Sequence, residues 1–309
     1  MNGEQAYIRW LRQRWVAHPR VLVGPGDDAA VLTWPSDRSV VVTTDMLMEG
    51  TCFVLAQAGA RRVGRKALAV NLSDLAAMAA RPVACVVSVA LPQVGGRAVA
   101  EELYLGMEEL SKAFDIPIVG GDTNSWSGPL VIAVTALGEC GPRGPVRRRG
   151  AQAGDWLLLT GPLGGSLLGH HLTFTPRVRE ALTLVDLVRV HAMIDISDGL
   201  STDLAHLCQE SDCGACVEAA LLPIRPEAEQ FDDGRSPLEH ALHDGEDFEL
   251  LFAVSPEDGA SLLADQPLQP LGVHLYRIGS CRSEKTLTLI LPDGRSQPLV
   301  PRGYEHRLD

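Results

Sequence analysis

The chain has 309 residues, of which 46% are hydrophobic and 21% are charged, and its formal net charge is −12 at pH 7. This length and composition are typical of a globular protein with about two domains. The acidic balance argues against a broad basic surface, so we expect no nucleic-acid partner and no membrane partner. The N-terminal residues lack the apolar core of a signal peptide, and a cytoplasmic location is therefore predicted.

Strand-like and helix-like segments alternate in the first half of the chain, which predicts an α/β or α+β fold. Apolar residues spaced three or four apart indicate helices, and short β-branched runs indicate strands. In chain order, we expect a strand at 40–42 ending at Thr43-Thr44-Asp45, a helix at 61–80, a strand at 83–91, a helix carrying Leu103, Met107, Leu110 and Phe114, a short strand at 116–119 running into Gly120-Gly121-Asp122, and a strand at 130–137.

A domain boundary is predicted in the segment 141–154, which is rich in glycine, proline and arginine. The two expected domains are residues 1–145 and residues 146–309. Beyond the boundary, we expect a strand at 155–160, a turn at 161–165, a helix from about 200 to 208 with Ser201 as its N-cap, a strand at 249–254, and a late hairpin around Asp293-Gly294.

The cysteines are odd in number and scattered, which argues against a disulfide framework. Cys213 and Cys216 form a lone CxxC without a second pair at zinc-finger spacing. We therefore interpret them as buried free thiols rather than as metal ligands.

Seven aspartates lie in or beside short turns that are rich in glycine, threonine and serine. Short carboxylates beside such turns suit hard cations, and Mg²⁺ in particular takes oxygen ligands while keeping waters and substrate phosphates in its shell. The pattern therefore indicates a site where several metal ions hold phosphates. The seven residues are Asp27, Asp28, Asp45, Asp74, Asp122, Asp195 and Asp198.

Asp74 gives the sharpest signal, because it lies in a helix that is apolar almost all round and is therefore expected to be buried. An ionised carboxylate is costly there unless it is paired or binds a metal, and capping of a nearby loop is the alternative. Asp45 follows two threonines at a predicted strand end, where ligands of α/β sheets gather. Thr-Asp also begins many ordinary turns.

Asp195 and Asp198 come just ahead of the predicted helix at 200–208, where free N–H groups attract phosphate. An ordinary N-cap is the alternative interpretation. Gly120-Gly121 would let the backbone approach a ligand closely. The chain has only three lysines, none of which follows a glycine, so a P-loop mechanism is excluded. His170-His171 is interpreted as a surface or packing pair.

Taken together, these stretches resemble the thiamine-monophosphate kinase family within the aminoimidazole ribonucleotide synthetase-like superfamily. The matching phrases occur in the family's order and span nearly the whole chain. They are GPGDDAAVL, VVTTDMLMEG, KALAVNLSDLAAMAARP, IVGGDTN, IDISDGLSTDLAHL, GEDFELLF and GYEH. The combination of NLSDLAAM, GGDT and DISDGL is specific to the family.

The resemblance implies ATP-dependent phosphorylation of thiamine monophosphate to thiamine diphosphate, by direct in-line transfer with several Mg²⁺ ions and no protein nucleophile. ATP is then a co-substrate. The residues that would contact Mg²⁺ are Asp28, Thr43, Thr44, Asp45, Asp74, Asp122, Asp195 and Asp198. Those that would contact ATP are Tyr104, Gly121, Asp122, Arg149 and Ser197. Those that would contact thiamine monophosphate are Cys52, Glu246 and Tyr304.

Cys52 departs from the family pattern, because many relatives have a histidine there, and a thiol does not replace the hydrogen bonding of an imidazole. The resemblance further implies a homodimer built on the sheet of the N-terminal domain, with the C-terminal α/β domain closing over nucleotide and substrate. Two rival hypotheses stay open. The chain could be another ATP-dependent synthetase of the superfamily with a different acceptor, or a nucleotide- and Mg²⁺-binding regulator without turnover.

Overall fold

The computed structural model describes residues 3–25 and 29–305 and divides the chain into two compact units. Unit 1 comprises Met1–Leu75 and Ala80–Gly144, and unit 2 comprises Ala76–Ala79 and Pro145–Asp309. Each unit combines helices with β-sheet. Among the described residues, no helix has both the length and the apolar character needed to cross a membrane.

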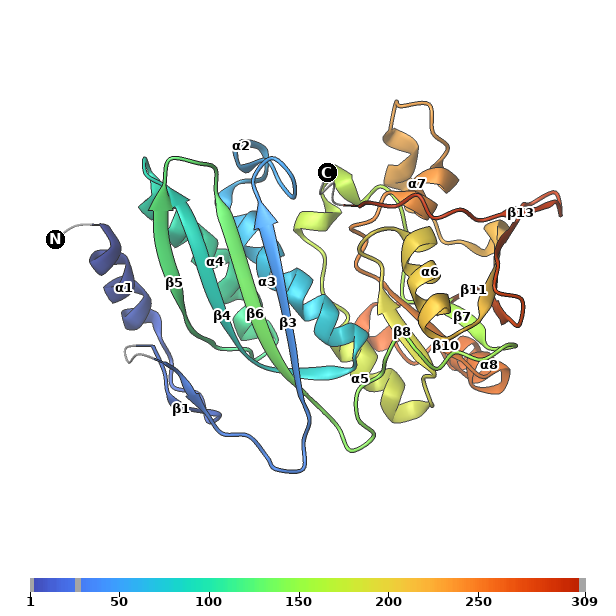
Figure 1. Ribbon diagram of the computed structural model, residues 1–309, viewed down its shortest axis with the longest axis horizontal. Coiled ribbons are helices and arrows are strands. Elements are labelled where there is room, and N and C mark those ends of the chain that lie inside the picture. Colours follow the sequence, from blue (N-terminus) through green and yellow to red (C-terminus); the bar gives the residue numbers. More distant parts are fainter. Residues whose placement is uncertain (1–2, 26–28, 306–309) are drawn as a thin grey trace. The chain divides into compact units, whose positions relative to one another are not determined.

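Unit 1 contains a four-stranded sheet in the order β3-β6-β4-β5, with two helices across one of its faces (Figure 1). Only β4 and β5 pair in parallel. Its elements are α1 (Gly3–Arg14), β1 (Val21–Val23), β2 (Val31–Leu32), β3 (Val40–Met48), α2 (Leu55–Ala58), α3 (Ala60–Ala77), β4 (Ala80–Pro92), α4 (Gly96–Ala113), β5 (Ile118–Trp126) and β6 (Val131–Cys140).

The two long helices of unit 1 cross in direct backbone contact. A Cβ atom added to Gly64 on α3 would lie 2.0 Å from the carbonyl oxygen of Leu103, and one added to Gly106 on α4 would lie 1.9 Å from that of Arg61. Such distances are far below van der Waals contact, so only glycine fits. The close crossing fixes α3, and with it Asp74, against the sheet. The helices predicted at 61–80 and around Leu103 are confirmed.

Two predicted strands are longer than expected, and this changes where the acidic motifs lie. Thr43, Thr44 and Asp45 lie inside β3 rather than at its end, because Leu47 continues the alternation of inward-facing residues along the strand. Gly120-Gly121-Asp122 likewise lies inside β5, where it pairs with β4. A Cβ atom at Gly121 would be 1.9 Å from the carbonyl oxygen of Val87. The close approach that Gly121 permits in this structure is therefore to a neighbouring strand.

Unit 2 contains a seven-stranded sheet in the order β13-β12-β9-β11-β7-β10-β8. The strands predicted at 155–160 and 249–254, and the late hairpin of β12 with β13, are confirmed. Its elements are β7 (Trp156–Leu159), the short 3₁₀ helices η1 (Ser166–Leu168), η2 (His170–Leu172), η3 (Ala219–Leu221), η4 (Pro226–Gln230) and η5 (Gln269–Leu271), α5 (Val178–Leu187), β8 (Ala192–Asp195), α6 (Leu200–Glu210), β9 (Gly214–Glu218), α7 (Pro237–His243), β10 (Leu250–Val254), α8 (Pro256–Asp265), β11 (Tyr276–Arg282), β12 (Leu287–Ile290) and β13 (Ser296–Pro298).

The core of unit 2 is formed by aliphatic side chains of β7, β8, β10 and α6, including Leu157, Ile194 and Leu204. All seven cysteines of the chain are free. Cys213 and Cys216 are buried, as expected for free thiols in an apolar core. The loops after β8 and before β10 are therefore connected to strands of a well-packed sheet, which holds their ends in place.

Candidate functional site

Three of the predicted metal-binding residues, Thr43, Asp45 and Asp74, lie on the face of the unit 1 sheet that α3 covers. Thr43 and Asp45 are both half-buried and lie on the same side of β3. The Thr43 hydroxyl donates a hydrogen bond to the Asp74 carboxylate on α3. The helix around Asp74 is buried as predicted, whereas Asp74 itself is only half-buried. The three side chains offer hydroxyl and carboxylate oxygens on one face of the sheet, the ligand type that a hard cation takes.

The side chain of Thr44 points to the opposite, open face of the sheet, because successive strand residues alternate. Its hydroxyl donates to the Val134 carbonyl oxygen at 3.1 Å and accepts from the Thr135 hydroxyl at 3.0 Å. Asp122 is exposed and pairs in register with Ser88 across β4 and β5. Strand geometry thus separates the side chain of Thr44 from those of Thr43 and Asp45.

A cavity of about 840 Å³ lies in unit 1 between α1, α4, β4 and β5. Its lining combines apolar side chains, such as Leu11 and Met107, with the polar groups of Tyr104, Gly121 and Asp122. The Tyr104 ring makes an edge contact with Trp10, at 5.4 Å between ring centroids, and burial raises the pKa of its hydroxyl. A cavity of this size that is lined by both apolar side chains and convergent polar groups suits a small molecule.

In unit 2, Asp195 is the last residue of β8, and Ser197 and Asp198 lie between β8 and α6. One oxygen of the buried Asp203 carboxylate accepts the backbone N–H groups of residues 197, 198 and 199 at 3.0–3.1 Å. The prediction of Ser201 as the N-cap is wrong, because Ser201 lies inside α6. The N–H groups of residues 197–199, just ahead of the helix, are held by Asp203. Asp203 takes the place that an N-cap side chain usually fills.

The acids at the start of α6 repel one another. Burial, together with Asp195 and Asp198, raises the pKa of Asp203 to about 8 against the opposing effect of the amide donors. Ligand atoms of Asp198, Asp203 and His206 all lie within 4.8 Å of one another. Asp203 and His206 were not among the predicted residues. Their spacing of three places them on one helix face and was the only sequence signal that could have found them.

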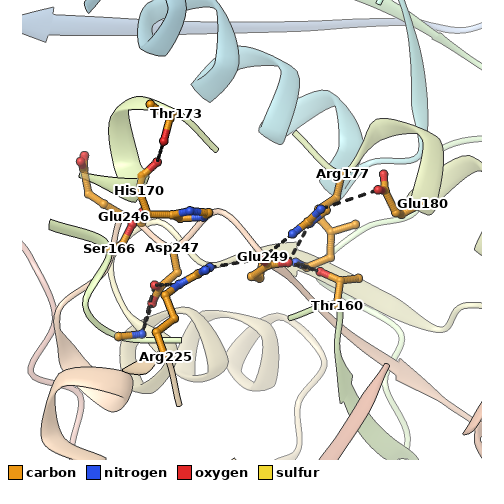
Figure 2. Close-up of polar contacts among 12 residues, drawn as sticks. Thr160, Ser166, His170, Thr173, Arg177, Glu180, Arg225, Glu246, Asp247 and Glu249 are labelled. Atoms are coloured by element: carbon orange, nitrogen blue, oxygen red, sulfur yellow. Dashed lines mark hydrogen bonds and ion pairs between the residues drawn. The ribbon is translucent and has the colours of Figure 1, made fainter. Parts of the chain in front are cut away.

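The segment 246–249 before β10 forms the centre of a buried polar network (Figure 2). Arg177 donates to both oxygens of Glu249 at 2.8 and 2.7 Å, and Arg225 reaches the same carboxylate at 3.3 Å. Arg225 also lies 3.6 Å from Asp247, whose pKa burial raises to about 7. Glu246, the predicted substrate contact, is half-buried at the edge of this network.

His170 lies beside the same network and behaves as a packing residue, as predicted. Its ring is 6.4 Å from that of Phe174, in a tilted arrangement. Burial, together with Arg225 and Arg177, lowers the pKa of His170 to about 4. The imidazole is therefore neutral in the folded protein at pH 7.

The remaining predicted contacts lie in three separate places. The Tyr304 backbone N–H donates to the carbonyl oxygen of Asp198 at 3.0 Å, while its side chain is 48% exposed. Arg149 is exposed in the segment that follows β6. Cys52 follows β3, and its carbonyl oxygen accepts from the Lys66 ammonium at 2.9 Å. Asp27 and Asp28 lie outside the described residues.

Comparison with known proteins identifies the family. Residues 26–140 match the N-terminal domain model of AIR synthase related proteins, and residues 152–291 match the C-terminal domain model. A thiamine-monophosphate kinase of Rhodopirellula baltica is 41% identical over 98% of this chain and 97% of its own. The chain belongs to the thiamine-monophosphate kinase family. Both the family resemblance and the two-domain AIR synthase-like fold are thereby confirmed.

Solved structures of thiamine-monophosphate kinases share the whole fold. The crystal structure of the Stenotrophomonas maltophilia kinase is 33% identical, with a TM-score of 0.81 over 94% of this chain and 96% of that chain. AaThiL complexed with AMPPCP and TMP is 27% identical, with a TM-score of 0.76 over 99% of this chain and 97% of that chain. This second structure holds a nucleotide analogue and the family's substrate together.

The carboxylate of Asp203 should stabilise unit 2 through its three amide contacts. Asp203→Ala leaves those N–H groups without their acceptor, and we expect the free energy of unfolding to fall by about 3 kcal/mol. Asp203→Asn keeps a carbonyl oxygen and should lose about 1 kcal/mol. Urea unfolding followed by circular dichroism measures both, with the exposed Asp186→Ala on α5 as the control. An Ala variant as stable as the wild type would show that other acceptors replace Asp203.

His170 should make unit 2 less stable as the pH falls. The unfolded chain takes up a proton near pH 6.5, whereas the folded imidazole takes it up only near pH 4. Between these values the unfolded state binds more protons at this site, so the contribution of His170 to the free energy of unfolding decreases on acidification. His170→Phe should weaken this dependence in urea unfolding at pH 7, 6 and 5. The exposed His274→Phe is the control, and parallel profiles for His170→Phe and wild type would contradict the assignment.

Proposed function

We propose that the protein transfers the γ-phosphoryl group of ATP to thiamine monophosphate and releases thiamine diphosphate. Its membership of the kinase family and its likeness to AaThiL complexed with AMPPCP and TMP support this reaction. The observation in the structure that carries the proposal is the cavity of about 840 Å³ in unit 1, which Tyr104, Gly121 and Asp122 line together. All three were assigned to ATP from sequence motifs alone.

Mg²⁺ suits the donor set of both units. Thr43, Asp45 and Asp74 offer hydroxyl and carboxylate oxygens on one face of the unit 1 sheet. In unit 2, burial and the charges of Asp195 and Asp198 raise the pKa of Asp203, and a divalent cation would relieve the part of this shift that comes from the charges. We propose these residues, with Asp28, Thr44 and Asp122 from the family motifs, as those that would hold Mg²⁺. When bound, Mg²⁺ neutralises the negative charge on two phosphates that must approach each other.

The protein's own groups would bind and orient the reactants. Ser197 and Arg149 would join the cavity residues in contacting ATP. The Glu246 carboxylate would face the cationic thiazolium ring, and the Tyr304 ring would lie against a heterocycle. Cys52 would contact the substrate where many relatives carry histidine. The acceptor phosphate is already ionised near pH 7, so the transfer needs no protein base and no phosphoenzyme.

We propose the same division of labour for the two domains as the sequence motifs indicate. Residues 1–145 would carry most of the metal and ATP contacts together with the dimer interface, and residues 146–309 would bind the substrate and close over the nucleotide. A different acceptor, or binding without turnover, is the alternative. Product analysis with ATP and thiamine monophosphate, compared with other phosphorylated acceptors, distinguishes these functions.

The open face of the unit 1 sheet supports a homodimer. Large apolar side chains on this face are exposed, with Val42 60% and Met46 61% exposed. Val40, Met48 and Val86 add to the same patch. Contiguous exposed apolar surface of this kind marks an interaction site in a soluble protein. We propose that a second copy of the chain covers it.

Asp45→Asn should abolish thiamine diphosphate formation while leaving the fold intact. The substitution keeps the shape of the side chain but removes the charge that would hold Mg²⁺, so we expect a loss in kcat on the order of 100-fold. Chromatography of the product measures turnover, and urea unfolding measures stability. Asp37→Asn is the control, because that carboxylate is exposed in the same unit. Retained turnover with Mg²⁺ would contradict the role of Asp45.

Met46→Glu should convert a dimer into monomers, because it places a charge in the middle of the apolar patch. Sedimentation velocity at micromolar concentration measures the change in mass. Val94→Glu is the matched control, since Val94 is 92% exposed in the turn between β4 and α4. A wild-type protein that sediments as a monomer at all concentrations would refute the homodimer.

A further inference from the structure

The backbone of the segment 245–248 has an unusual conformation. Glu246 and Phe248 both have left-handed φ angles, 56° and 52°, and neither is a glycine. They follow Gly245, whose φ is 74°. Non-glycine residues hold such angles only where the surrounding structure imposes them, and they gather at functional sites.

Asp247 lies between the two left-handed residues and is fixed from the side of the sheet. Both oxygens of its carboxylate accept the Gly164 N–H at 3.1 Å, and Arg225 lies 3.6 Å away. The same arginine reaches Glu249 from one side while Arg177 reaches it from the other, as Figure 2 shows. The side chains of Asp247 and Glu249 are both 1% exposed or less. Two acids are thus buried on either side of Phe248.

Backbone contacts join this segment to the predicted metal and ATP loop after β8. The Glu246 N–H donates to the Ser197 carbonyl oxygen at 2.7 Å, and the Phe248 N–H donates to the Ile196 carbonyl oxygen at 2.8 Å. The Ser166 hydroxyl donates to the carbonyl oxygen of Glu246. Both backbone polar groups of Glu246 are therefore held, and its position depends on the residues around it.

The Phe248 ring also holds the segment 245–248 in place. It stacks on Phe174 with 4.2 Å between ring centroids and an interplanar angle of 13°. Side chains at 247, 248 and 249 thus all point into unit 2, which leaves Glu246 as the half-buried member of the motif. Buried ion pairs contribute little net stability compared with apolar packing, and setting a unique geometry is the role they serve best.

We propose that Asp247 is a positioning residue for phosphoryl transfer, which acts by holding the Glu246 carboxylate toward thiamine monophosphate. This inference rests on the proposed function and adds a residue to it. Asp247 touches neither reactant. It fixes the left-handed backbone of Glu246 through Gly164 and Arg225, and Ser166 fixes the same residue through its carbonyl oxygen. Loss of the Asp247 contacts or of the Ser166 contact would allow the Glu246 carboxylate to move away from the substrate.

A double-mutant cycle tests the proposal in the full-length protein. Glu246→Gln and Asp247→Asn should each raise the KM for thiamine monophosphate by about tenfold, the size expected for loss of one charge-assisted contact. The KM for ATP should change much less. The double variant should be no worse than the poorer single variant, because both changes remove the same interaction. A purely structural role for Asp247 would instead give effects that multiply.

Ser166→Ala is the second variant, because it removes only one hydroxyl and keeps the fold if Asp247→Asn does not. It should raise the KM for thiamine monophosphate in the wild-type background and not in Glu246→Gln. Ser255→Ala is the control for stability. It removes the N-cap contact to Asp258 on α8 without touching the network, and its KM should equal that of the wild type.

The outcomes separate the two claims. If the wild type is active and the effects of Glu246→Gln and Asp247→Asn on the KM multiply in the double variant, the positioning role is wrong and the kinase assignment stands. If the wild type is active and Glu246→Gln leaves the KM for thiamine monophosphate unchanged, the positioning role is again wrong and the kinase assignment stands. A wild type that forms no thiamine diphosphate overturns the proposed function, and the positioning role falls with it. Equal KM values for Ser166→Ala and wild type also count against the inference.

Discussion

Hydrogen bonds from backbone amides to two buried carboxylates set the shape of the loops in unit 2. Asp203 gathers the amides ahead of α6, and Asp247 accepts the Gly164 amide beside a left-handed segment. Burying a carboxylate costs free energy unless N–H donors surround it. Each acid therefore depends on the loop conformation that supplies these donors, and the loop conformation depends on the acid that accepts them. The loops meet directly through the Glu246 N–H and the Ser197 carbonyl oxygen. The residues proposed to contact substrate and nucleotide, Glu246 and Ser197, are thereby joined through their backbones.

Electrostatics explains why an acidic, lysine-poor chain suits this chemistry. Two arginines of unit 2 are already paired, since Arg177 and Arg225 balance Glu249 and Asp247 inside the protein. Burial, together with the charges of Asp195 and Asp198, raises the pKa of their neighbour Asp203. The proposed Mg²⁺ ions would relieve the repulsion among these acids. An acidic chain would in this way recruit the cations that its phosphate reactants need.

The sequence predicted elements that depend on periodicity and missed features that depend on tertiary contact. The apolar stripe of Leu103 and Met107 identified α4, and the residue types of the motifs identified the kinase family. Thr-Asp at 44–45 and the paired glycines at 120–121 look like turns locally, but pairing with β6 and β4 keeps both segments extended. The role of Asp203 as the acceptor for residues 197–199 was invisible, because Ser201 satisfies the same local N-cap pattern.

Strand β3 illustrates how one segment serves two proposed purposes at once. Its alternation directs Thr43 and Asp45 toward α3 and directs Val42 and Met46 to the open face. A shift of one residue in the pairing with β6 would exchange the two sets and destroy both surfaces. The close crossing of α3 and α4 at Gly64 and Gly106 holds the helix that carries Asp74 in place. Register in the sheet therefore sets both faces of β3, and the face proposed to bind metal depends in addition on the helix contact behind it.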